Sequence, residues 1–116
     1  MPPDVTAKTL RAAAALVLQG WCRYKLGRTA AGKSCPPCSN DAAAWCLAGA
    51  ITRAATDLAP SCAWPLIDDA RVALTNTLPD GATIHTFNDT ELRNGGDAAN
   101  WLELAARNLE RTNQDA

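Results

Sequence analysis

The most reactive side chains of this sequence are five cysteines, and their number and spacing limit the chemistry that they could perform. An odd number of cysteines, in a chain whose start does not resemble a secretion signal, does not predict a framework of disulfides. Cys35 and Cys38 form a C-x-x-C pair, which is half of a zinc site or a redox-active dithiol. The candidates for the further zinc ligands are Cys22, Cys46, Cys62 and His85.

No second pair with zinc-site spacing and no β-α-β pattern accompanies the C-x-x-C pair. We therefore expect mostly reduced thiols, no metal ion and no cofactor. Whether Cys35 and Cys38 bind zinc or form a disulfide is left open by the sequence.

A cysteine-dependent enzyme would need a base and an orienting group beside its nucleophile. Cys46, His85 and either Asn88 or Asp89 have the required residue types. The apolar periodicity places Cys46 inside a helix instead of in a strained turn, and only geometry identifies a triad. We predict no catalytic residue, and the cysteine-dependent enzyme stays an alternative.

A second motif with possible chemistry is the octapeptide that begins at Gly27 and ends at Ser34, which matches the phosphate-binding loop G-x4-G-K-S. That loop needs a helix whose first amides face the phosphates. Pro36 and Pro37 fall where the helix would continue. The match is therefore interpreted as accidental, and a small-ligand or nucleotide binder is kept as an alternative.

Charge is distributed unevenly along the chain, although the formal net charge is only −1. Residues 1–34 carry six basic side chains against Asp4, a balance of +5, which leaves −6 on residues 35–116. Four of the basic residues are close in sequence: Arg23, Lys25, Arg28 and Lys33. They are candidates for contact with an acidic partner, whereas the net charge makes nucleic acid unlikely as a partner.

The elements that must position these residues are predicted to be helical. A chain of 116 residues, with 24 alanines and few aromatics, predicts one all-α domain over residues 1–116. Apolar residues at helical spacing predict four helices, at about residues 6–20, 40–59, 64–78 and 97–111. Residues 27–40 are predicted to be a long Gly/Pro/Cys loop, and residues 82–86 a short extended segment. Residues 21–26 could be helix or strand.

The segment from Trp45 to Ile51, W-C-L-A-G-A-I, together with the later Phe87-Asn88-Asp89, resembles a family of small uncharacterised proteins of bacteria and their phages. The upstream Gly20-Trp21 and a terminal helix also fit this resemblance. The family implies a fold but no established activity. The motif residues are interpreted mainly as packing residues and caps, with Trp45, Asn88 and Asp89 as candidates for the wall of a pocket.

These observations together favour a non-enzymatic helical module that binds another protein. The resemblance suggests a phage accessory or anti-defence protein that inhibits a host protein, with a host or phage protein as partner. No apolar run is long enough to span a bilayer, so we expect no membrane association and a cytoplasmic location.

Overall fold

The computed structural model describes residues 2–115, and it places five α-helices around one core. The helices are α1 (Pro3–Gln19), α2 (Leu47–Leu58), α3 (Ala63–Thr77), α4 (Ile84–Thr90) and α5 (Gly95–Asp115), with a short 3₁₀ helix, η1 (Pro60–Cys62), between α2 and α3. The strands are β1 (Gly27–Thr29), β2 (Ser34–Cys35) and β3 (Ala42–Trp45). The expectation of a mostly helical domain is therefore confirmed. The prediction of four helices without a sheet is wrong, because the structure has five α-helices and a small three-stranded sheet.

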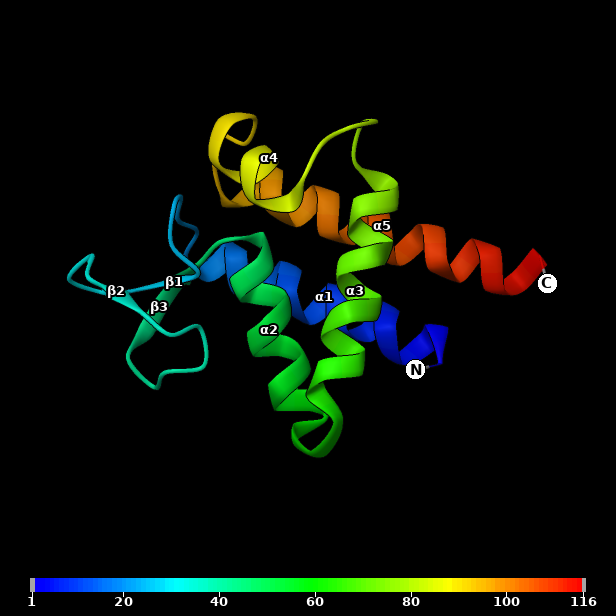
Figure 1. The fold of residues 1–116 in the computed structure, drawn as a ribbon, viewed down its shortest axis with the longest axis horizontal. Helices are drawn as coiled ribbons and strands as arrows, with labels where there is room; N and C mark the ends of the chain where they lie inside the picture. The colour runs from blue at the N-terminus through cyan, green and yellow to red at the C-terminus, as the bar shows by residue number, and fades with distance from the viewer. Residues whose placement is uncertain (1, 116) are drawn as a thin grey trace.

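Four of the helices, α1, α5, α2 and α3, form two crossed pairs (Figure 1). Helices α1 and α5 run antiparallel, since Val17 lies against Gly95 while Arg11 pairs with Glu103. Helices α2 and α3 form an antiparallel hairpin that packs across this pair. The sheet projects from the end of the molecule where α1 stops and α2 begins.

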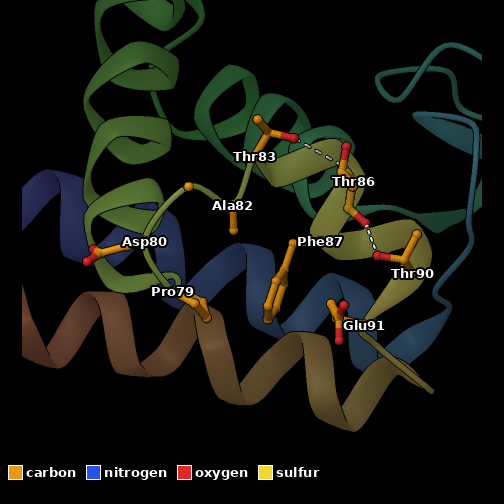
Figure 2. Close-up of a pocket in the computed structure, with 9 residues that line it drawn as sticks. Pro79, Asp80, Ala82, Thr83, Thr86, Phe87, Thr90 and Glu91 are labelled. Carbon is orange, nitrogen blue, oxygen red and sulfur yellow. Dashed lines mark hydrogen bonds between the residues drawn. The ribbon is translucent and has the colours of Figure 1, made fainter.

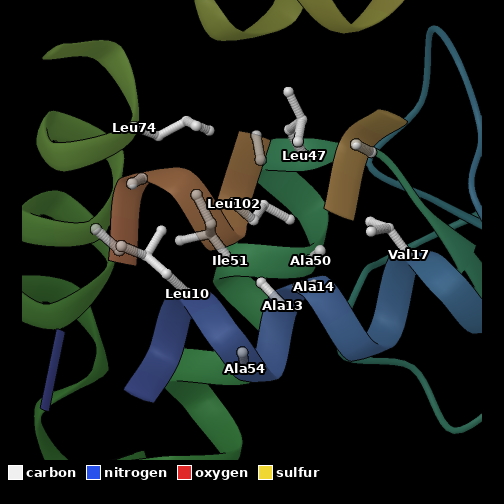
Figure 3. Packing of buried hydrophobic residues seen from close by; sticks show 14 of the residues in the cluster. Leu10, Ala13, Ala14, Val17, Leu47, Ala50, Ile51, Ala54, Leu74 and Leu102 are labelled. Carbon is white, nitrogen blue, oxygen red and sulfur yellow. The ribbon is translucent and has the colours of Figure 1, made fainter. Parts of the chain in front are cut away.

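Alternating large and small apolar side chains fill the space between the helices (Figure 3). Leu10 and Val17 of α1 and Leu47 and Ile51 of α2 are almost completely buried. Alanines allow the backbones to approach closely. The alanines in this part of the core include Ala13, Ala14, Ala50 and Ala54. Helix α2 contributes seven buried residues and packs against α1, α3 and α4.

The predicted loop at residues 27–40 contains a β-hairpin in which β1 pairs antiparallel with β2. Strand β3 pairs with the other edge of β1, so the order in the sheet is β2-β1-β3. The second helix was predicted to begin near residue 40, but residues 42–45 are extended and α2 begins at Leu47. Ala42 and Ala44 pair with Thr29 and Arg28 of β1, although a run of alanines would favour a helix in isolation.

Three further expectations about local structure are corrected. Residues 82–86 do not form an extended segment, because α4 begins at Ile84. Thr83 is the N-cap of this helix, and its hydroxyl accepts a hydrogen bond from Thr86 N. Between α1 and β1, Trp21 makes an isolated bridge with Trp45, and the residues that follow form bends. The last helix begins at Gly95, two residues before its predicted start at residue 97.

Candidate functional site

Asn88 connects three segments that are distant in sequence. Its Oδ1 accepts hydrogen bonds from Trp21 Nε1 at 2.9 Å and from Leu47 N at 3.1 Å. Its Nδ2 donates to Cys22 O at 3.1 Å and to Asp89 Oδ1 at 2.9 Å. The Asn88 side chain is buried, so water does not compete for these hydrogen bonds. They connect α4 to the residues that follow α1 and to the first turn of α2.

Residues 22–26 form a short exposed segment that we call the display loop. Cys22 N donates to Trp45 O at the start of the loop, and Leu26 O accepts from Cys46 N at its end. Tyr24, in the middle, is the one non-glycine residue with positive φ in the part of the chain that the structure describes, at 71°. Its N–H donates to Asp89 Oδ1 at 2.9 Å, which holds this costly conformation in place.

The display loop presents apolar surface to solvent. Tyr24 is 70% exposed and Leu26 is 42% exposed. Asn88 and Asp89, which the sequence offered as wall residues of a pocket, form hydrogen bonds to the backbone of this loop, and Asp89 also lines a small cavity beneath it. Sequence reasoning missed Tyr24, because no pattern of residue types marks a tyrosine in the left-handed conformation.

A small cavity of about 80 Å³ lies under the loop and brings together the three residue types of a cysteine triad. Cys46, His85 and Asp89 line it with residues of the display loop. Cys46 is not inside a helix as predicted. It is the N-cap of α2, where its sulfur accepts a hydrogen bond from Gly49 N at 3.3 Å.

The environment of the two buried thiols keeps them protonated. Burial raises the pKa of Cys46, although the Gly49 N–H opposes this effect by favouring the thiolate. Burial, with the nearby Cys46, raises the pKa of Cys22 from 9.0 to about 11. A nucleophilic cysteine needs the opposite shift. The capping role therefore accounts for Cys46 better than nucleophilic catalysis does.

We expect iodoacetamide at pH 8 to modify the exposed Cys38 and Cys62 well before the buried Cys22 and Cys46, because only thiolates react and burial blocks access. The rate at Cys22 should continue to rise with pH up to about 11. Peptide mass spectrometry of a time course on the folded protein measures these rates. Alkylation of Cys46 as fast as that of Cys62 would support the enzyme alternative instead.

Trp45 is buried, and its indole holds the Cys-Pro-Pro-Cys segment against the sheet. Trp45 Nε1 donates to Pro37 O at 2.9 Å. The Arg53 guanidinium lies 5.8 Å from the centroid of the Trp45 ring and donates to Pro37 O and Ser39 O. These bonds fix the long segment before β3. Among residues 2–115, no group of three or more His, Cys, Asp or Glu side chains is arranged to hold a metal ion.

The four basic candidates divide into two kinds. Arg23 stacks on Trp21 at 4.9 Å and donates to Leu92 O at 2.6 Å, while its buried Nε has no partner among the described residues. Arg28 donates to Gly32 O and Arg23 O. Both arginines therefore brace the backbone. The other two, Lys25 and Lys33, are exposed.

The match to a phosphate-binding loop lies on the β1–β2 hairpin. Gly32 occupies the turn with a φ of 84°, and Ser34 begins β2 instead of a helix. Thr29 N donates to Lys33 O across the turn. The segment therefore lacks the helix N-terminus that such a loop aims at phosphates, as the prolines indicated.

A larger hollow lies on the other side of α4, between that helix and the turn after α3 (Figure 2). It encloses about 520 Å³ and is open to solvent at the surface. Phe87 forms its apolar wall, and Asp80 and Glu91 flank it.

No helix of the described chain is long and apolar enough to cross a membrane.

Residues 1–108 match the model described as "Family of unknown function (DUF6197)", which confirms the resemblance to an uncharacterised family. No curated protein and no solved structure matches the chain.

Proposed function

Because the chain belongs to the family of unknown function DUF6197, whose description names no activity, we propose a function from the display loop: this is a non-enzymatic module that binds another protein. The observation that carries the proposal is the exposed Tyr24, held in a strained backbone conformation by Asp89. Strain that the surrounding structure maintains is characteristic of functional sites.

The composition of the loop suits a protein interface. Tyrosine is enriched among the residues that dominate binding energy, and here it lies beside the partly exposed Leu26. Lys25 lies between Tyr24 and Leu26 in the sequence and is exposed. This arrangement favours a partner whose surface has an apolar hollow with acidic groups beside it.

The rigidity of the loop also supports binding. Its two ends are bonded to Trp45 and Cys46, and its centre is bonded to Asp89. A loop that is already ordered loses little conformational entropy when a partner binds, so more of the contact energy contributes to affinity. A role as a phage accessory protein that inhibits a host protein in the cytoplasm belongs to this proposal.

The test separates binding from folding with Tyr24→Gly. Glycine adopts positive φ without strain, so we expect the stability to change by less than about 1 kcal/mol, whereas the exposed ring is lost. A photoreactive phenylalanine at position 24 first captures the partner from a cell lysate, with the same probe at the exposed Val72 as control. Calorimetry with the purified partner then measures affinity.

We expect Tyr24→Gly to weaken binding by about 30-fold, the effect of a residue that contributes roughly 2 kcal/mol. Val72→Ala on α3 should leave the affinity unchanged. Equal affinity of the Tyr24→Gly variant and the natural protein would exclude the display loop as the contact surface.

A further inference from the structure

The groove on the outer side of α4 is separate from the display loop and combines an apolar wall with negative charge. Its lining comes from the turn after α3, from α4 and from the residue that follows α4. The lining residues are Pro79, Asp80, Gly81, Ala82, Thr83, Thr86, Phe87, Thr90 and Glu91. They include two carboxylates and no basic side chain.

In Figure 2 the side chains of Asp80 and Glu91 lie on opposite sides of Phe87, and the carboxylate of Asp80 points away from the ring. Within residues 2–115, neither Asp80 nor Glu91 has an ion-pair or hydrogen-bond partner for its carboxylate. Elsewhere on the surface, the carboxylates of Glu103 and Glu110 pair with Arg11. The lining of the groove therefore carries negative charge without a basic side chain, and the interactions of these exposed charges are screened over about 10 Å at 0.1 M salt.

The wall between the carboxylates is apolar and fixed in place. The ring of Phe87 packs against Trp101 with the centroids 5.1 Å apart and the planes at 82°. Pro79 and Ala82 complete the apolar lining beside it. A ligand with an apolar stem and a cationic end would cover this wall and place its charge near a carboxylate.

We propose that this groove binds an arginine side chain of a partner protein. The methylene stem lies against Phe87, and the guanidinium is held in the field of Asp80 and Glu91. A guanidinium is weakly hydrated and bonds carboxylates in a planar arrangement, so it suits this site better than a strongly hydrated ammonium group. The inference does not depend on the display loop, because α4 separates the two surfaces.

The test titrates the ¹⁵N-labelled protein with N-acetyl-arginine-N-methylamide and follows the amide resonances. We expect millimolar binding, with shifts concentrated in residues 79–91. The citrulline analogue has nearly the same shape without the charge, and it should bind at least about threefold more weakly. Asp80→Asn/Glu91→Gln should weaken the arginine probe by about 3- to 10-fold, as expected for two exposed charges.

A charge-matched control removes two exposed carboxylates elsewhere, with Asp41→Asn/Asp68→Asn. That variant should keep the affinity within twofold of the natural protein. Equal binding of the arginine and citrulline probes would overturn the proposal, as would an equal loss of affinity in both double variants. Shifts scattered over the whole surface would also overturn it. Because no display-loop residue is changed, failure here leaves the test of Tyr24 unaffected.

Discussion

Gly49→Ala should destabilise the protein by about 3 kcal/mol, although alanine is normally the better residue in a helix. A Cβ at position 49 would lie 1.9 Å from the carbonyl oxygen of Leu26 and 2.8 Å from its carbonyl carbon. Both are backbone atoms, so no side-chain rotation relieves the overlap. The first turn of α2 and the end of the display loop must separate, which also strains the bond from Cys46 N to Leu26 O.

Urea denaturation measures this loss, and Gly96→Ala in α5 is the matched control. A Cβ at position 96 meets only the end of the Asn94 side chain, at 3.1 Å. That atom can move by a few tenths of an ångström, so the control should change stability by less than about 1 kcal/mol in either direction. Gly49→Leu should lower the free energy of unfolding further than Gly49→Ala does, because its side chain is larger. Unchanged stability of both Gly49 variants would mean that α2 does not touch the display loop.

The sequence predicted the long helices well, because their burial follows helical periodicity. Leu66, Ile67, Ala70 and Leu74 of α3 are buried as the apolar spacing requires. The short helix α4 was missed although it carried a signal. Thr83 precedes Ile84, Phe87 and Asn88, whose spacing of three and four residues is that of one buried helical face.

The error at the start of α2 has a different origin. Three consecutive alanines have a high helix propensity, yet all three lie in β3, because Ala42 and Ala44 pair with residues of β1 on either side of a register shift. Gly20 makes this arrangement possible, since a Cβ there would lie 2.1 Å from Ala43 O. Contacts between segments decide this structure, and a single sequence does not show them.

The same reason limits what could be predicted about the site. Asn88 and Asp89 were correctly singled out as capping and bonding residues, since both types commonly bond to backbone groups. Their partners in residues 21–24 could not be inferred, because 64 or more residues separate them in the chain. The structure thus changes the interpretation of the W-C-L-A-G-A and F-N-D motifs: they position the display loop.

Asn88→Ala should have the largest effect of any polar substitution, a loss of about 4 kcal/mol. The change leaves Trp21 Nε1, Leu47 N and Cys22 O without the partners that Asn88 provides. An unpaired buried polar group costs about 1–3 kcal/mol, and water that enters the vacated space would recover part of the total. Thermal unfolding should show a fall in Tm of more than about 10 °C, whereas Asn76→Ala on the exposed face of α3 should change Tm little.

Asn88→Asp tests whether the loss comes from hydrogen bonding or from packing, because the shape of the side chain is retained. The carboxylate can still accept from Trp21 and Leu47, but it no longer donates to Cys22 O and it lies beside Asp89. Burial and the neighbouring charge must raise its pKa in the folded protein above the unfolded value of about 4. The deficit relative to the natural protein should therefore be small below pH 4 and grow as the pH rises to 7. The absence of a deficit at both pH 4 and pH 7 would assign the role of Asn88 to packing.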